Sequence, residues 1–95
     1  MLRISDISTT PDVTRLRLEG QVTGAWVGEL RRVCAGVIGN NGHPQGRLLL
    51  DLTGLSFLDV EGVGLFRELA QQQVIFLNGS PFIAEQLKGV ADVNR

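Results

Sequence analysis

The sequence predicts an α/β fold, a mixed β-sheet packed with about three α-helices in the order β-β-α-β-α-β-α. Two almost wholly apolar runs, residues 48–50 and 74–77, are typical of parallel strands that are covered on both faces. Each run is followed by a helix-start signal, Asp59 after the first and Ser80 with Pro81 after the second. Strand and helix therefore alternate, which predicts right-handed strand-helix-strand units.

The amino-terminal half predicts two strands and a helix. Leu2 and Ile4 favour a first strand, and residues 14–22 alternate between apolar and charged side chains, as in a half-exposed strand antiparallel to the first. From Ala25 the apolar spacing becomes helical. The expected helical stripe consists of Trp26, Leu30, Val33 and Val37, widened by Val27, Cys34 and Ile38. A loop rich in glycine and asparagine, residues 39–44, ends this helix.

The central part of the chain, residues 48–69, predicts a buried strand, a tight apolar connection and a helix. Asp59 is expected to cap that helix, and Glu61 adds a negative charge that the helix dipole favours. Gly62 and Gly64 lack a Cβ, which predicts a close approach of the helix to the sheet. The expected core stripe is Val63, Phe66, Leu69 and Ala70, and that of the last helix is Ile83, Leu87 and Val90.

Length and composition limit the possible functions. Residues 1–95 suffice for one domain, and 43% hydrophobic and 20% charged residues are in the globular range. The net charge of −1 gives no general attraction to nucleic acid or to an anionic membrane. No apolar run approaches the ~20 residues that span a bilayer, and no signal-type segment follows Met1, so we expect a cytoplasmic protein without membrane insertion. Cys34 is the one cysteine, and its place in the helical stripe predicts a packed thiol.

Three carboxylates, Asp51, Asp59 and Glu61, are expected near the carboxyl end of the central strand. Acid-base catalysis or metal binding needs further groups, and no histidine or cysteine lies nearby in the sequence. We therefore predict no enzymatic activity, no metal and no cofactor. Gly62 and Gly64 resemble part of a phosphate-binding loop, but Asp59 and Glu61 place negative charge where the phosphate would sit.

Other residues have simple interpretations. His43 is expected to be a solvated loop residue. Trp26 is expected to be a core anchor, with a role at an interface as the alternative. Arg3, Arg15 and Arg17 could form a basic patch, although a solvated sheet face is the commoner explanation.

The segment DLTGLSFLDVEGVG, residues 51–64, resembles the signature of the STAS domain, the family of anti-sigma factor antagonists and of the cytoplasmic tails of sulfate transporters. Residues 14–24 and 80–90 are also similar to this family, at matching positions in the chain. In the family, the residue after the aspartate is often a serine or threonine that a partner kinase phosphorylates to end binding. Here that position is Val60, which has no hydroxyl to modify.

The resemblance implies a non-enzymatic protein-interaction module, similar to an anti-sigma factor antagonist but without the usual phosphorylation switch. The expected partner-binding residues are Asp59, Val60, Glu61 and Gly62. The implied partner is an anti-sigma kinase with an ATPase-like fold. Two alternatives stay open: a small STAS subunit bound to the ATPase of an ABC lipid-transport complex, and a small-molecule or nucleotide sensor.

Overall fold

A computed structural model describes residues 1–10, 12–39 and 47–94. Its elements are β1 (Leu2–Thr9), β2 (Val13–Val22), α1 (Ala25–Gly39), β3 (Arg47–Leu58), α2 (Val60–Gln71), β4 (Ile75–Leu77), α3 (Pro81–Gln86) and β5 (Val93–Asn94). The predicted fold class and order of elements are confirmed, and the short β5 is added at the end. His43 and most of the predicted loop lie outside the described residues.

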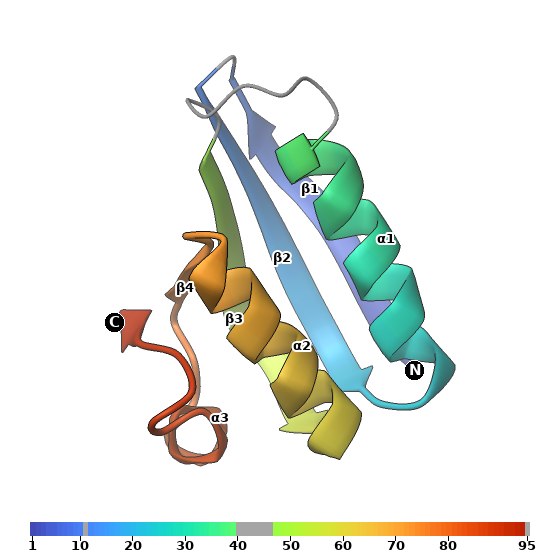
Figure 1. Cartoon of the computed structure of the whole chain (residues 1–95), viewed down its shortest axis with the longest axis vertical. Coiled ribbons are helices and arrows are strands. Elements are labelled where there is room, and N and C mark those ends of the chain that lie inside the picture. The colour runs from blue at the N-terminus through green and yellow to red at the C-terminus, as the bar shows by residue number, and fades with distance from the viewer. Residues whose placement is uncertain (11, 40–46, 95) are drawn as a thin grey trace.

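One sheet with the strand order β1-β2-β3-β4-β5 organises the fold (Figure 1). β1 and β2 are antiparallel, as predicted, and the other neighbouring strands are parallel. Parallel neighbours need crossover connections, which α1, α2 and α3 provide. β3 is the middle strand, so its predicted central position is confirmed.

β3 is much longer than predicted. The segment expected to be a tight connection continues the strand to Leu58, giving 12 residues. The reason is the pairing with β2, which runs from Val13 opposite Arg47 to Val22 opposite Leu58. Backbone hydrogen bonding to a long neighbour thus outweighs the turn-forming tendency of Gly54.

The helices α1 and α2 lie next to each other over one face of the sheet (Figure 1). Leu48 and Leu50 are buried in the core, but Leu49 between them is only half-buried and lies outside the core cluster. The prediction that both faces of this run are covered is therefore wrong. Leu49 lies between Arg15 and Ile75 in the sheet, and an arginine stem can shield apolar surface while its charge stays hydrated.

The helices α1 and α2 differ from the predicted stripes in some of their buried residues. α1 packs mainly on β2 and β3, which buries Val27, Leu30 and Cys34 and leaves Trp26 38% exposed. On α2, Leu65 is buried although the predicted stripe omitted it, while Val63 is only partly buried. The predicted helices are thus confirmed, and so is the burial of Leu30, Phe66 and Leu69, whereas Trp26 and Val63 lie at the margin of their stripes.

The core explains two side chains. Phe66 of α2 stacks on Phe76 of β4, with ring centroids 5.0 Å apart, which fixes α2 to the sheet. Cys34 is fully buried, and burial raises the pKa of its thiol to about 12. The prediction of a packed thiol is confirmed.

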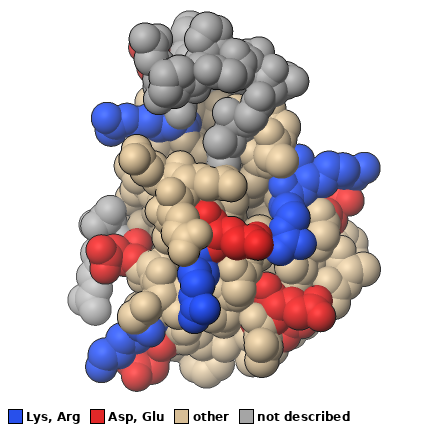
Figure 2. Space-filling view, viewed as in Figure 1, with Lys and Arg blue, Asp and Glu red and all other residues tan. Residues whose placement is uncertain are grey.

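Charges of both signs are interspersed over the face formed by α1 and α2 (Figure 2). Arg31 pairs with Glu68 across the two helices at 3.0 Å. Because such exposed pairs contribute at most about 1 kcal/mol, they matter more for solubility than for stability. None of the helices in the described ranges has the length and hydropathy of a membrane-spanning helix.

Candidate functional site

The candidate site begins at Asp59, which lies between β3 and α2. One carboxylate oxygen, Oδ1, accepts a hydrogen bond from the Gly62 N–H at 2.7 Å, so the predicted helix cap is confirmed. The other, Oδ2, accepts from the Gly24 N–H at 2.9 Å, in the turn before α1. The hydrogen bonds from Gly24 and then Gly62 lower the pKa of this carboxyl. Asp59 is therefore an ionised group that ties together the starts of two helices.

Val60 and Glu61 project from the first turn of α2. Val60 is 89% exposed, the highest value among the large apolar side chains in the described ranges. Glu61 is exposed as well. An isolated exposed valine is common, but this one lies between two carboxylates at the positive end of a helix.

Gly62 lies beneath this surface. It is buried, and a Cβ at this position would lie 2.6 Å from the backbone oxygen of Val22. The predicted close approach of helix and sheet is therefore right for Gly62. It is wrong for Gly64, where a Cβ would meet open space. Gly62 positions the helix, and the side chains that a partner could touch are those of its neighbours.

A groove of about 580 Å³ runs beside Val60, between α2, the end of β3 and α3. Its lining includes Phe57, Val63, Arg67 and Gln86. Phe57 also stacks on Phe82 of α3 at a centroid distance of 6.3 Å, and the two rings are 39% and 55% exposed. Exposed aromatic rings of this kind are frequent anchors at protein interfaces.

Gln86 fixes the position of α3 beside this groove. Its Oε1 accepts from the Leu58 N–H at 3.1 Å, and its Nε2 donates to the Leu58 backbone oxygen at 2.8 Å. β4 pairs with β3 only from Leu49 to Asp51, so the amide of Gln86 takes the place of a neighbouring strand at Leu58. The groove is thus held by hydrogen bonds to the main chain.

Sequence reasoning missed Phe57, Phe82 and Gln86. Phe82 lies outside the apolar stripe of Ile83, Leu87 and Val90, which was a signal that its ring would be exposed. Nothing in the sequence indicated that it meets Phe57, because that contact depends on how α3 lies against β3.

Asp51 lies elsewhere, so the expectation that it lies near the carboxyl end of the central strand is wrong. It sits in the interior of β3, and at roughly 3.3 Å per residue the extended chain separates it from Asp59 by on the order of 20 Å. Within the described ranges, no group of three or more His, Cys, Asp or Glu residues could hold a metal ion.

The surroundings of Asp51 indicate a structural role. Its side chain is 2% exposed, and it accepts hydrogen bonds from the backbone and side chain of Thr53 and from Asn78 at 3.4 Å. Arg15 and Arg17 lie above it at 3.5 and 3.6 Å. Burial alone raises the pKa of Asp51, but the hydrogen bonds and the charge of Arg17 outweigh it and lower the pKa to about 2. Arg15 and Arg17, two of the three arginines of the possible basic patch, therefore share the negative charge of Asp51.

The two hydroxyls near the family's modified position are both used within the fold. Thr53 donates to Asp51, and Ser56 donates to the backbone oxygen of Gly20 at 2.9 Å. Neither lies in the first turn of α2, where Val60 is exposed.

Comparison with known proteins agrees with this architecture. The family model described as the STAS domain matches residues 5–88. The unphosphorylated anti-sigma factor antagonist SpoIIAA is similar over 98% of this chain and 88% of its own, with a TM-score of 0.75 and 20% identity. The phosphorylated form of SpoIIAA from Bacillus, a cell fate determinant, gives 100% and 92% coverage, a TM-score of 0.69 and 20% identity.

An anti-sigma factor antagonist from Mycobacterium paratuberculosis is also similar, over 99% of this chain and 86% of its own, with a TM-score of 0.70 and 14% identity. No curated protein sequence gives a significant match. At these identities the solved structures establish the fold, while the family model covers most of the sequence. The chain therefore belongs to the STAS domain family.

Proposed function

We propose that this STAS domain is a non-enzymatic interaction module that binds a protein partner through the start of α2. The docking surface consists of Asp59, Val60 and Glu61 together with Phe57 and Phe82. The observation that carries the proposal is the exposure of Val60, 89%, at a helix tip beside two exposed aromatic rings. Apolar side chains that the fold leaves uncovered gain most from burial against a partner.

The charges around the docking surface favour a partner with a basic rim. Asp59 is held ionised by its two backbone hydrogen bonds, and Glu61 lies next to Val60. A positively charged rim on the partner would speed association and fix its orientation, while the apolar centre supplies most of the affinity.

Val60 also bears on regulation. At the position that the family often phosphorylates, valine cannot accept a phosphate, so binding here is not switched at this residue. A phosphate at this point would add about −1.5 to −2 charges beside Asp59 and Glu61, and the cost of desolvating this charge in the apolar centre of the contact would disfavour docking. The proposed module therefore binds without a phosphorylation switch at Val60.

The fold it shares with anti-sigma factor antagonists supports an anti-sigma factor of the kinase type as the partner. The ATPase of an ABC lipid-transport complex is the alternative within the same fold. A nucleotide sensor is less well supported, because Asp59 already occupies the N–H groups of Gly24 and Gly62 that could receive a phosphate.

The test captures partners from the source cell lysate on three immobilised baits. These are the natural chain, Val60→Asp at the docking surface, and Ile7→Asp as a matched change at an exposed apolar residue of β1. A partner of the docking surface is retained by the natural chain and by Ile7→Asp and is lost with Val60→Asp. Mass spectrometry then distinguishes a sigma-factor circuit from a transporter ATPase.

Surface plasmon resonance with the purified partner refines the result. Glu61→Lys should slow association about tenfold, and a melting curve should show that the variant stays folded. If Val60→Asp and Glu61→Lys bind normally while charge reversal of Arg15 and Arg17 abolishes binding, the interface lies on the open sheet face and the proposal is wrong.

A further inference from the structure

The groove beside Val60 has an opening in the wall that α2 contributes. Four residues of α2 form this wall: Val60, Val63, Gly64 and Arg67. They stand at positions i, i+3, i+4 and i+7 of the helix, which is the spacing of the four residues that form a hole for a side chain of a facing helix. Because Gly64 has no side chain, this hole is open down to the main chain. We call these four residues the α2 hole.

The fold does not need a glycine at position 64. Gly64 is exposed in the interior of α2, and a Cβ at this position would meet no atom within 4 Å. Gly62 is different, because a Cβ there would lie 2.6 Å from the backbone oxygen of Val22. A glycine in an exposed helix interior is less favourable than an alanine. Gly64 therefore lowers the stability of α2 without improving the packing of the domain.

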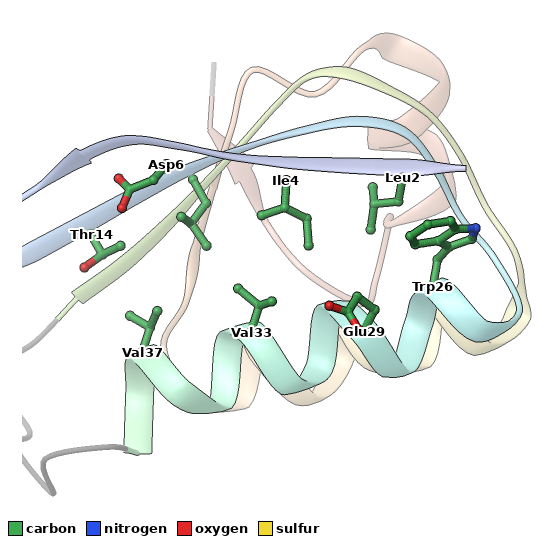
Figure 3. A pocket seen from close by; sticks show the side chains of 9 residues that line it. Leu2, Ile4, Asp6, Thr14, Trp26, Glu29, Val33 and Val37 are labelled. Carbon is green, nitrogen blue, oxygen red and sulfur yellow. The ribbon is translucent and has the colours of Figure 1, made fainter.

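A second groove, between β1 and α1, has the same volume of about 580 Å³ but no such hole. The helix lines it with residues that all carry side chains, namely Trp26, Glu29, Val33 and Val37 (Figure 3). α1 also has two exposed glycines, Gly28 and Gly36, at which a Cβ would meet open space, but neither lines this groove or the groove beside Val60. Gly64 therefore differs from them in its place at the centre of a groove wall.

The charges around the α2 hole restrict the chemistry of a ligand. Arg67 is exposed, and within the described ranges it forms no hydrogen bond or ion pair. Asp59 lines the other end of the groove, but both of its carboxylate oxygens already accept hydrogen bonds from the main chain. The amide of Gln86 on the opposite wall is likewise bonded to Leu58. A ligand therefore meets apolar surface at the hole and one unpaired positive charge beside it, which favours an apolar group next to a carboxylate.

We propose that an α-helix of the protein partner crosses α2 here and places a leucine, methionine or phenylalanine side chain in the α2 hole. The inference rests on the proposed function and adds the geometry of the contact. Without a Cβ at Gly64, the two helix axes can approach to the short end of the usual range of about 8–10 Å. One helical turn from the inserted side chain, the partner helix carries an aspartate or glutamate that pairs with Arg67.

Substitutions of Gly64 separate the fold from the contact. Gly64→Ala should raise the melting temperature by about 4 °C, because alanine favours the helix and its Cβ has room. The same Cβ fills part of the α2 hole, so surface plasmon resonance should show at least about tenfold weaker binding of the purified partner. Gly64→Met, which fills the hole with a good helix former, should abolish binding. The matched changes Gly36→Ala and Gly36→Met, on exposed α1, should leave binding unchanged.

A selection from displayed helices tests the α2 hole without the natural partner. The library presents an alanine-rich helix of about 18 residues, long enough to fold alone, with the positions of one face randomised. On the natural chain and on Gly36→Met we expect enrichment of a large apolar residue with an acidic residue one turn away, and on Gly64→Met no enrichment. Arg67→Glu should reverse the charge preference from acidic to basic. A second library with a central proline cannot form the continuous helix and serves as the control.

Several results would overturn the proposal. A lower melting temperature for Gly64→Ala would mean that the fold itself needs the glycine. If no helix is enriched on the natural chain, if Gly64→Met enriches the same helices, or if the proline library is enriched instead, the α2 hole does not receive a helix. A partner that is lost with Val60→Asp but retained by Gly64→Met overturns the α2 hole and leaves the docking surface in place. Retention by both variants overturns the docking surface as well.

Discussion

Asp51 and Asp59 stand eight positions apart in the chain, and the structure uses them in opposite ways. Asp51 is buried in the interior of β3, under two arginines. Asp59 lies just beyond the end of the same strand, where its carboxylate accepts hydrogen bonds from two backbone N–H groups beside the exposed Val60. Both carboxyls have a lowered pKa, so a lowered pKa alone does not identify a functional site.

The difference comes from what surrounds each carboxylate. The Asp51 side chain is only 2% exposed, and its carboxylate is surrounded by polar groups of Thr53, Asn78, Arg15 and Arg17. Around Asp59 the neighbours Val60 and Glu61 are exposed. Changes at Asp51 should therefore affect stability, whereas changes beside Asp59 should affect recognition.

The largest effect is expected for Asp51→Ala. It leaves Arg15 and Arg17 without their shared carboxylate and removes the hydrogen bonds from Thr53, so the free energy of unfolding should fall by about 3 kcal/mol. Urea unfolding followed by Trp26 fluorescence measures it. Asp51→Asn, which keeps the shape and one acceptor, should lose clearly less. A loss below about 1 kcal/mol for the alanine variant would mean that the buried carboxylate is dispensable.

The pH dependence of the free energy of unfolding should also report on Asp51. Because the pKa of Asp51 is about 2 in the folded protein and about 3.9 in an unfolded chain, its contribution is fully present above pH ~4 and is lost as the pH falls towards ~2. This contribution amounts to about 2 to 3 kcal/mol. Unfolding curves at several pH values should fall more steeply for the natural chain than for Asp51→Asn. Parallel curves would assign acid sensitivity to other carboxyls.

Asp59→Ala should have a smaller effect, because the N–H groups of Gly24 and Gly62 can form hydrogen bonds with water instead. We expect the melting temperature to fall by about 5 °C, with faster hydrogen exchange at the Gly24 and Gly62 amides. The Gly24 amide is the critical one. If its exchange rate is unchanged, Asp59 caps α2 only and does not connect the two helix starts.

Arg17→Gln should have the smallest effect. Arg17 is 46% exposed and reaches Asp51 only at 3.6 Å, so its removal should cost less than about 1 kcal/mol. Denaturation in low and high salt checks this, because screening reduces the contribution of an exposed ion pair. A cost as large as that of Asp51→Ala would show that the arginine, and not Thr53, holds the buried carboxylate.

Much of the fold was predictable, because local signals act at short range. The cap at Asp59, the Ser80 and Pro81 helix start and the alternation in β2 each depend on a few neighbouring residues. The length of β3 was not predictable in this way. It depends on pairing with β2, which lies far earlier in the chain. Ser56 of β3, for example, donates a hydrogen bond to the backbone oxygen of Gly20, 36 positions earlier, and no local pattern indicates this contact.

The exposure of the proposed site was predictable in part for the same reason. Val60 and Glu61 follow a recognisable cap in the segment that resembles the family signature, and both are exposed. Phe57, Phe82 and Gln86 come from two segments that meet only in the folded chain, and Asp51 was misplaced because an extended strand was read as a compact connection. Errors arose wherever position depended on the pairing of distant segments.

The amide of Gln86 limits which residues can stand at its position. Leu58 offers a donor and an acceptor side by side, and only an amide side chain of suitable length can answer both at once. Glutamate would face the Leu58 backbone oxygen with a second acceptor, and lysine would face its N–H with a second donor. The amide of Gln86 therefore helps to fix α3, and with it Phe82, beside the end of β3, so that an uncharged side chain shapes the proposed docking surface.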